Sequence, residues 1–248
     1  MSTVSSQPTA SRAPDDCAAV VLISAASEWR AVRAGYPASA PHPSPFGEWF
    51  AVSLAVAGRA MPIVFAQGGW GKIAAAASTQ YAIDRWAPPL VVNLGTCGGF
   101  HGLIERGTIV LAERTVVYDI IERMGDPEAA IAAYATDLDL AWLGDDLPHP
   151  VRRGLLVSGD ADLDPAAITD LHTRFGAVAG DWESGAIAHI AARNNVRCLI
   201  LRGVSDLVSA EGGEAYDGTL HAFDASAGAI MNTLLQTLPE WLARGSAT

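Results

Sequence analysis

The sequence has few cysteines, and their arrangement indicates neither a disulfide framework nor a zinc site. Cys17, Cys97 and Cys198 are odd in number and widely spaced, and no Cys-x-x-Cys pair is present. A disulfide scaffold needs paired cysteines, and a structural zinc site needs closely spaced ligand pairs. We therefore expect no metal and no other cofactor.

Long apolar runs are also missing, since none reaches the roughly 20 residues that a membrane-spanning helix needs. The N-terminal segment is rich in Ser, Ala and Pro and lacks the basic and apolar regions of a signal peptide. We therefore expect a disordered leader at residues 1–17 and a cytoplasmic protein.

Basic residues are scarce as well: 16 Lys and Arg face 27 Asp and Glu, for a formal net charge of −11 at pH 7. A protein that binds nucleic acid usually needs a basic face that displaces counterions. A protein that binds an anionic membrane surface usually needs a basic face as well. Because no cluster of Lys or Arg occurs, we expect neither nucleic acid nor a membrane as a partner.

Short apolar runs punctuated by glycine recur along the chain and predict buried strands. They lie at residues 18–23, 62–66, 90–94, 108–111, 154–157 and 198–201. Helical patterns occur at residues 73–86, 184–194 and 223–242, the last one interrupted by Pro239. This alternation predicts one α/β domain at residues 18–245, with a central mixed, mostly parallel β-sheet flanked by helices.

Polar segments follow several of these strands, where ligands bind in sheets of this kind. The Gly-rich segment 95–99 is predicted to form a turn whose backbone N–H groups approach an oxygen-rich ligand, or simply a tight turn. Taken alone, Glu183 is equally explained as an acid at a helix N-terminus, and Asp206 as a helix N-cap. Single residues therefore do not decide the function.

Five segments taken together resemble the nucleoside phosphorylase and nucleosidase superfamily, nearest to its 5′-methylthioadenosine/S-adenosylhomocysteine nucleosidases. The segments are residues 69–76 (Gly-Trp-Gly-Lys-Ile-Ala-Ala-Ala), 93–99 (Asn-Leu-Gly-Thr-Cys-Gly-Gly), 158–160 (Ser-Gly-Asp), 181–183 (Asp-Trp-Glu) and 202–206 (Arg-Gly-Val-Ser-Asp). Their order and spacing match the family from about residue 20 to about residue 235. The resemblance implies a nucleoside phosphorylase-like fold and cleavage of the N-glycosidic bond of a purine nucleoside.

The resemblance assigns catalytic roles to three acids. Asp206 would protonate the departing purine at N7, a form of acid catalysis that contributes on the order of 10²–10⁴-fold. Its carboxyl should be partly desolvated to hold a proton near neutral pH. Glu183 would hold the ribose hydroxyls and oppose the positive charge of the sugar in the transition state. Glu28 would activate the attacking water, with a position on a surface helix as its alternative.

Further residues are expected to bind the substrate. Thr96, Cys97 and Gly98 belong to the Gly-rich segment, while Arg202 and Ser205 would orient the loop that bears Asp206.

Two expected binding residues depart from the family pattern. Trp182 replaces the family's Met and either packs under the ribose or belongs to the core. Asp162 replaces an aromatic residue that stacks on adenine; an acid can instead accept hydrogen bonds from base N–H groups. Stacking would then fall to Trp70, Phe100 or Trp182.

The nucleophile is predicted to be water, because Asn93 stands where related phosphorylases carry a phosphate-binding Arg. Arg30 offers another cation, so a phosphate-dependent purine nucleoside phosphorylase remains the alternative. A non-catalytic nucleoside-binding protein is a third hypothesis, disfavoured because binding alone would not require all three acids. Residues 117–125 fall where the family contacts a second subunit, through Tyr118 and Met124, so we expect a homodimer.

Overall fold

The computed structural model describes residues 16–215 and 220–245, and the side chains of that range except those of residues 220–225. Most of the expected leader, residues 1–15, lies outside the described residues. Cys17, its last residue, is buried in the core. The backbone N–H of Ala18 donates to Pro62 O at 2.9 Å, so the chain is held in the fold at this residue.

Each of the six predicted strands is present. They are β1 (Ala19–Ile23), β4 (Arg59–Gln67), β5 (Leu90–Phe100), β6 (Ile109–Val117), β8 (Arg152–Ser158) and β10 (Arg197–Ser209). Five shorter or more polar strands complete the sheet: β2 (His42–Ser44), β3 (Gly47–Val56), β7 (Ala135–Asp137), β9 (Ala177–Asp181) and β11 (Gly212–Gly213). Apolar runs identify strands that are buried on both faces, whereas β2, β3, β7 and β11 are partly exposed. β9 is buried along its whole length, but it is short and ends in Gly180 and Asp181, so it forms no apolar run.

The strands form one 11-stranded sheet in the order β11-β10-β6-β8-β9-β5-β1-β4-β3-β2, with β7 beside β6. β10 also pairs with β5, so β5, β10, β6, β8 and β9 close into a ring. The pairs β1–β4, β1–β5, β5–β10, β6–β8 and β8–β9 are parallel. The expected mixed α/β sheet is confirmed, although the hairpin β3–β4 and the pairs β5–β9 and β6–β10 give antiparallel pairing a larger share than apolar runs indicate.

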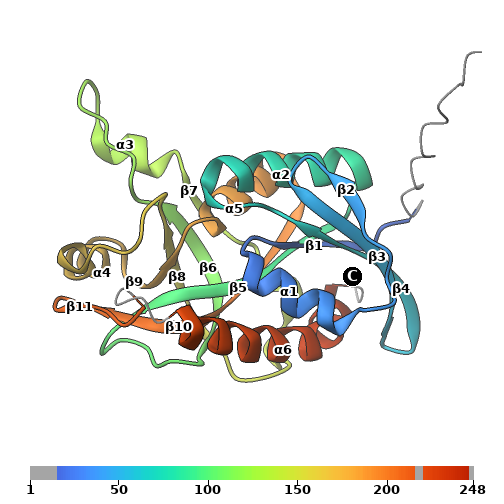
Figure 1. Ribbon diagram of the computed structural model, residues 1–248. Helices are drawn as coiled ribbons and strands as arrows, with labels where there is room; N and C mark the ends of the chain where they lie inside the picture. The colour runs from blue at the N-terminus through green and yellow to red at the C-terminus, as the bar shows by residue number, and fades with distance from the viewer. Residues whose placement is uncertain (1–15, 216–219, 246–248) are drawn as a thin grey trace, which may run out of the picture.

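Helices cover both faces of the sheet (Figure 1). α2 (Gly71–Trp86) and α5 (Ser184–Arg193) pack side by side on one face, and α1 (Ala26–Gly35) and α6 (Leu220–Gly245) on the other. α3 (Pro127–Ala132) and α4 (Ile168–Phe175) lie beside the ring of strands. Within the described ranges, no helix has the length and apolarity needed to cross a membrane.

α6 continues through Pro239, so the predicted interruption of this helix is wrong. Proline removes one backbone donor and clashes with the preceding turn. Leu238, Trp241 and Leu242, however, are all essentially inaccessible to solvent. Burial of these side chains on either side of Pro239 offsets the local cost of the proline and keeps the helix whole.

The Gly-rich segment 95–99 is not a turn. β5 continues through it to Phe100 and pairs with β10 from Gly95–Arg202 to Phe100–Val208, with a register shift between Val204 and Asp206. Glycine is required here by packing, because a Cβ on Gly95 would lie 2.2 Å from Arg202 Nη1. The two strands therefore carry site residues in register, where the sequence predicted loops.

Candidate active site

A cavity of about 460 Å³ opens where β5, β9 and β10 meet the start of α1 and the segment before α5. The residues to which the sequence analysis assigned a catalytic or substrate-binding role all line it: Glu28, Thr96, Cys97, Gly98, Asp162, Trp182, Glu183, Arg202, Ser205 and Asp206. These residues are up to 178 positions apart in the chain, between Glu28 and Asp206. The fold thus gathers the predicted residues into one place.

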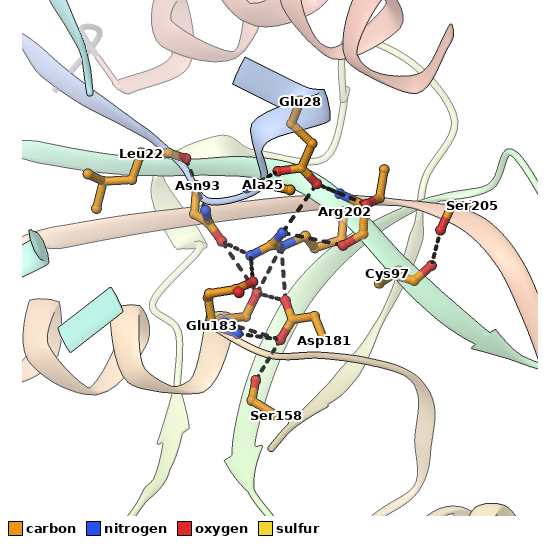
Figure 2. A network of polar contacts seen from close by, with 12 residues as sticks. Leu22, Ala25, Glu28, Asn93, Cys97, Ser158, Asp181, Glu183, Arg202 and Ser205 are labelled. Carbon is orange, nitrogen blue, oxygen red and sulfur yellow. Dashed lines mark hydrogen bonds and ion pairs between the residues drawn. The ribbon is translucent and has the colours of Figure 1, made fainter. Parts of the chain in front are cut away.

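Arg202 lies at the centre of a buried polar network (Figure 2). Only 1% of the residue is exposed. Its Nε donates to Ser184 Oγ at 3.1 Å and lies 2.9 Å from Asp181 Oδ2. Burial alone would lower its pKa, but the carboxylates of Asp181, Glu183 and Glu28 outweigh burial and raise it. Arg202 therefore stays a cation inside the fold.

Glu28 is not on an exposed helical surface, which excludes the alternative stated for it. It lies in the first turn of α1 and is 1% exposed. Its Oε1 accepts hydrogen bonds from Thr96 N at 2.7 Å and Thr96 Oγ1 at 2.8 Å, and its Oε2 accepts one from Ala25 N at 3.1 Å. Arg202 Nη1 is 4.0 Å from Oε1. The carboxylate is thereby fixed against β5 and at the cavity wall.

Glu183 occupies the N-cap position of α5, but its side chain does not cap that helix. Its Oε1 accepts from the backbone N–H of Gly71, the first residue of α2, at 3.1 Å, and its Oε2 lies 3.4 Å from Arg202 Nη2. Burial raises the pKa of Glu183 to about 7, against the lowering influence of Arg202; the negative charge of Asp181 raises it further. Near neutral pH this carboxyl is therefore present in both its neutral and its ionised form.

Asp206 lies within β10, directly after the register shift, and is not a helix N-cap. It is half-buried, and Ser205 Oγ donates to its Oδ1 at 2.6 Å. Burial raises the pKa of Asp206; the Ser205 hydrogen bond opposes this, and the charges of Glu214 and Asp162 add to it. The environment thus favours the protonated acid more than water does.

Trp182 and Trp70 approach each other at the cavity, with ring centroids 6.4 Å apart and planes tilted by 54°. Trp70 is 69% exposed and precedes α2, while Trp182 is half-buried. Phe100, a third stacking candidate, is fully buried in the core and does not line the cavity. Asp162 lines the cavity with its side chain exposed.

Asn93 and Arg30 lie outside the cavity lining. Asn93 is fully buried; its Nδ2 donates to Leu22 O at 3.0 Å, and its Oδ1 accepts from Arg202 Nη2 at 2.7 Å. Arg30 is exposed on α1. The position at which phosphorylases carry a phosphate-binding Arg is therefore used here to hold Arg202.

Two groups of residues went unassigned by sequence. Asp181 lines the cavity and bonds to Arg202, and its position beside Glu183 was the available signal. Lys72, from the first matching segment, binds Asp119 through Nζ, lies 3.6 Å from Asp160 Oδ2, and donates its backbone N–H to Asp160 Oδ1 at 2.7 Å. These contacts fix the start of α2, whose first N–H holds Glu183.

The charged groups of the cavity and its one cysteine indicate which chemistry its side chains can supply. Burial raises the pKa of the Cys97 thiol, so it is a poor nucleophile. Among the described residues, no group of three or more His, Cys, Asp and Glu side chains is arranged to hold a metal ion. The buried carboxylates instead surround a guanidinium and face the cavity with an excess of negative charge.

The protein is similar in sequence and in fold to 5′-methylthioadenosine/S-adenosylhomocysteine nucleosidases of several bacteria. The 5′-methylthioadenosine/S-adenosylhomocysteine nucleosidase of Anoxybacillus flavithermus is 29% identical over 167 residues, which cover 62% of this chain and 72% of that protein. The structure of the Campylobacter jejuni nucleosidase superposes with a TM-score of 0.72 at 19% identity and covers 90% of this chain and 98% of that one. The structure of the Colwellia psychrerythraea nucleosidase in complex with adenine superposes with a TM-score of 0.71 at 20% identity. It covers 92% of this chain and 96% of that one.

These solved structures share the fold described above. The sequence pattern described as the phosphorylase superfamily matches residues 20–238, which include every residue of the cavity lining. This protein therefore belongs to the phosphorylase superfamily.

Proposed function

We propose that this protein hydrolyses the N-glycosidic bond of a purine nucleoside and releases the free base. The substrate that we propose is an adenine nucleoside or 5′-thionucleoside. The observation that carries this proposal is one cavity lined by a half-buried acid with a raised pKa and by the buried carboxylates of Glu28, Asp181 and Glu183. Relatives named as methylthioadenosine/S-adenosylhomocysteine nucleosidases, one of them in complex with adenine, support the choice of substrate class.

Asp206 donates a proton to the departing base. Cleavage leaves the bonding electrons on the purine, so a proton delivered at N7 lowers the energy of the leaving group. The half-buried position of Asp206 favours its neutral form, and the Ser205 hydroxyl fixes one carboxyl oxygen. The other oxygen is then free to face the base in the cavity.

The sugar is held by Glu183, whose oxygens accept hydrogen bonds from the ribose hydroxyls. As the glycosidic bond breaks, positive charge develops on the ribose ring. Glu183 and Glu28 are fixed in advance by Gly71 N, Thr96 and Arg202, so their charge is already oriented towards this cation. Carboxylates that are fixed before the reaction stabilise the transition state more than mobile ones do, because they need not reorient as charge develops.

Water is the nucleophile, activated by Glu28 beside Thr96. A phosphate nucleophile needs free cationic donors, and Arg202 is the single basic side chain among the described residues that line the cavity. Its Nε and both Nη groups already contact Ser184, Thr96, Asn93 and the carboxylates. A phosphate dianion would also meet Glu28 and Glu183 at close range.

A panel of purine nucleosides and 5′-thionucleosides tests the proposal, with release of free base measured in phosphate-free buffer and with added phosphate. Hydrolysis predicts release in both buffers at equal rate, with the free sugar as the second product: ribose from a nucleoside and the corresponding 5-thioribose from a 5′-thionucleoside. Release that requires phosphate and yields ribose 1-phosphate would make the protein a phosphorylase. Binding without release from any nucleoside would support the non-catalytic hypothesis.

We also propose a cytoplasmic homodimer. Cys17, Cys97 and Cys198 are unpaired thiols, which suits a reducing compartment. Met124 is 100% exposed and Ile121 is 76% exposed. The contact of Lys72 with Asp119 brings this segment beside the start of α2, where Ile73 is also exposed. A second copy of the chain is the occupant that we propose for this apolar surface.

A further inference from the structure

Asp181 is the most extensively bonded carboxylate of the site, although it holds no role in the proposed reaction. Its Oδ1 accepts from Ser158 Oγ at 2.7 Å, Ser184 N at 3.1 Å and Glu183 N at 3.3 Å. Its Oδ2 lies 2.9 Å from Arg202 Nε and also accepts from Ser184 Oγ. One carboxylate therefore ties together the ends of β8 and β9, the start of α5 and the middle of β10 (Figure 2).

The guanidinium of Arg202 is a rigid plane, so a contact on its Nε edge also sets the direction of both Nη groups. Nη1 points to Thr96 O at 3.3 Å and lies 4.0 Å from Glu28 Oε1. Nη2 donates to Asn93 Oδ1 at 2.7 Å and lies 3.4 Å from Glu183 Oε2. Asp181 binds the Nε edge of the guanidinium, on the side away from Glu28. This contact orients the two Nη groups of Arg202 towards Glu28 and Glu183.

We propose that Asp181 is a positioning residue of the site: it fixes Arg202 and the backbone of Glu183 so that Glu28 and Glu183 are both aimed at the sugar. This inference rests on the proposed glycosidic cleavage. Asp181 acts through charge as well as geometry, because its carboxylate faces the same guanidinium as Glu183 and opposes ionisation of Glu183. Replacement of a residue that only supports the fold would lower the stability of the protein and leave kcat unchanged.

Two substitutions separate the position of the carboxylate from its charge. Asp181→Asn keeps the shape and removes the charge, whereas Asp181→Glu keeps the charge and displaces it by one methylene group. Asp137→Asn is the matched control, since Asp137 forms an exposed ion pair with Arg114 at 3.5 Å on β7, outside the cavity lining. Full-length proteins are compared by thermal unfolding, by kcat and KM, and by the pH dependence of kcat/KM.

Asp181→Asn should lower kcat on the order of 10²-fold, with a smaller effect on KM, because the reacting geometry is loosened. The rising limb of kcat/KM should move to lower pH, since Glu183 ionises more easily without a neighbouring negative charge. Asp181→Glu should also lower kcat but leave that limb close to its wild-type position. Asp137→Asn should match the wild type throughout.

Wild-type kcat in Asp181→Glu, or a wild-type pH profile in a folded Asp181→Asn, would overturn the proposal. If Asp181→Asn does not fold, Asp181→Glu decides the matter through kcat. A wild type that releases no base would refute the proposed function alone. In that case the ionisation of Glu183, followed by infrared difference spectroscopy with Glu183→Gln as reference, still tests Asp181 without turnover: an unchanged midpoint in Asp181→Asn contradicts our inference.

Discussion

Asp206 is held at an intermediate depth, where burial raises the pKa of its carboxyl group and the side chain still lines the cavity. Complete burial would keep the proton from the substrate, and full exposure would leave the acid ionised near neutral pH. Its hydrogen bond with Ser205 fixes the carboxyl without adding a positive charge that would remove the proton. The position of this one side chain therefore combines access with acidity.

Asp206→Asn tests that combination. The amide is similar in shape but has no acidic proton to give to the purine, so turnover should fall on the order of 10²–10⁴-fold. Release of free base measures the loss, and thermal unfolding serves as the control, since the half-buried site tolerates an amide. A variant that keeps the wild-type rate would remove Asp206 from the mechanism.

Glu183 should make both stability and activity depend on pH. Its folded-state pKa of about 7 lies above the 4.5 of an unperturbed Glu side chain, so the folded protein binds the proton more tightly than the unfolded chain does. The resulting stability is fully present below pH 4.5 and is lost as pH rises through about 7. Activity follows the opposite direction, because the ionised carboxylate is the form that opposes the sugar cation.

Measurements on Glu183→Gln should therefore show two changes. The amide cannot titrate, so the part of the free energy of unfolding that Glu183 loses between pH 5 and pH 8 should vanish, as followed by denaturant titration at each pH. The rising limb of kcat/KM should vanish as well, together with most of the activity. A rising limb of unchanged midpoint in this variant would assign that ionisation to another group.

At the scale of elements, the paired strands β5 and β10 determine the site, and glycine allows their side chains to meet. Gly95→Ala would place a Cβ 2.2 Å from Arg202 Nη1 and 2.8 Å from Glu28 Oε1. We expect a loss of about 1–3 kcal/mol in the free energy of unfolding, typical of overpacking, and a loss of activity as Arg202 shifts. Denaturant unfolding and base release measure the two effects.

Gly228→Ala is the matched control for that substitution. Gly228 lies within α6 and nothing stands within 4 Å of its added Cβ. Alanine also has the higher helix propensity, so the variant should be as stable as the wild type or more stable by up to about 1 kcal/mol. Equal destabilisation of both variants would argue against a specific conflict at Arg202.

Sequence patterns predicted elements well where the signal is local and poorly where it is not. The apolar runs identified β1, β5 and β10 because these strands are buried on both faces. The same apolar runs predicted that β5 ends at residue 94, because residues 95–99 are rich in glycine. The strand continues to Phe100 because it pairs with β10, which lies about 100 residues further along the chain. Asp181 was found only as part of the Asp-Trp-Glu segment and received no role, because its contact with Arg202 joins residues 21 positions apart that no local pattern connects.

The whole molecule presents an apolar segment on its surface that suits a second copy. Ile121→Asp and Met124→Asp should each lower the mass measured by light scattering from that of a dimer to that of a monomer, because a buried charge opposes association. Leu103→Asp is the control, since Leu103 is an exposed apolar residue of the loop after β5. A monomeric wild type would refute the homodimer.

The burial of Arg202 also bears on how the chain is made. During synthesis Glu28, Asp181 and Glu183 leave the ribosome before residue 202. Three acids that are destined for one interior would then have no cation between them, and an unpaired buried charge opposes compaction. A nascent chain that ends before β10 should consequently stay open and depend on chaperones, and the final fifth of the protein, from Arg197 onwards, should trigger the collapse of the whole. A stop codon introduced after residue 196 would therefore yield an unfolded chain in place of a smaller folded one.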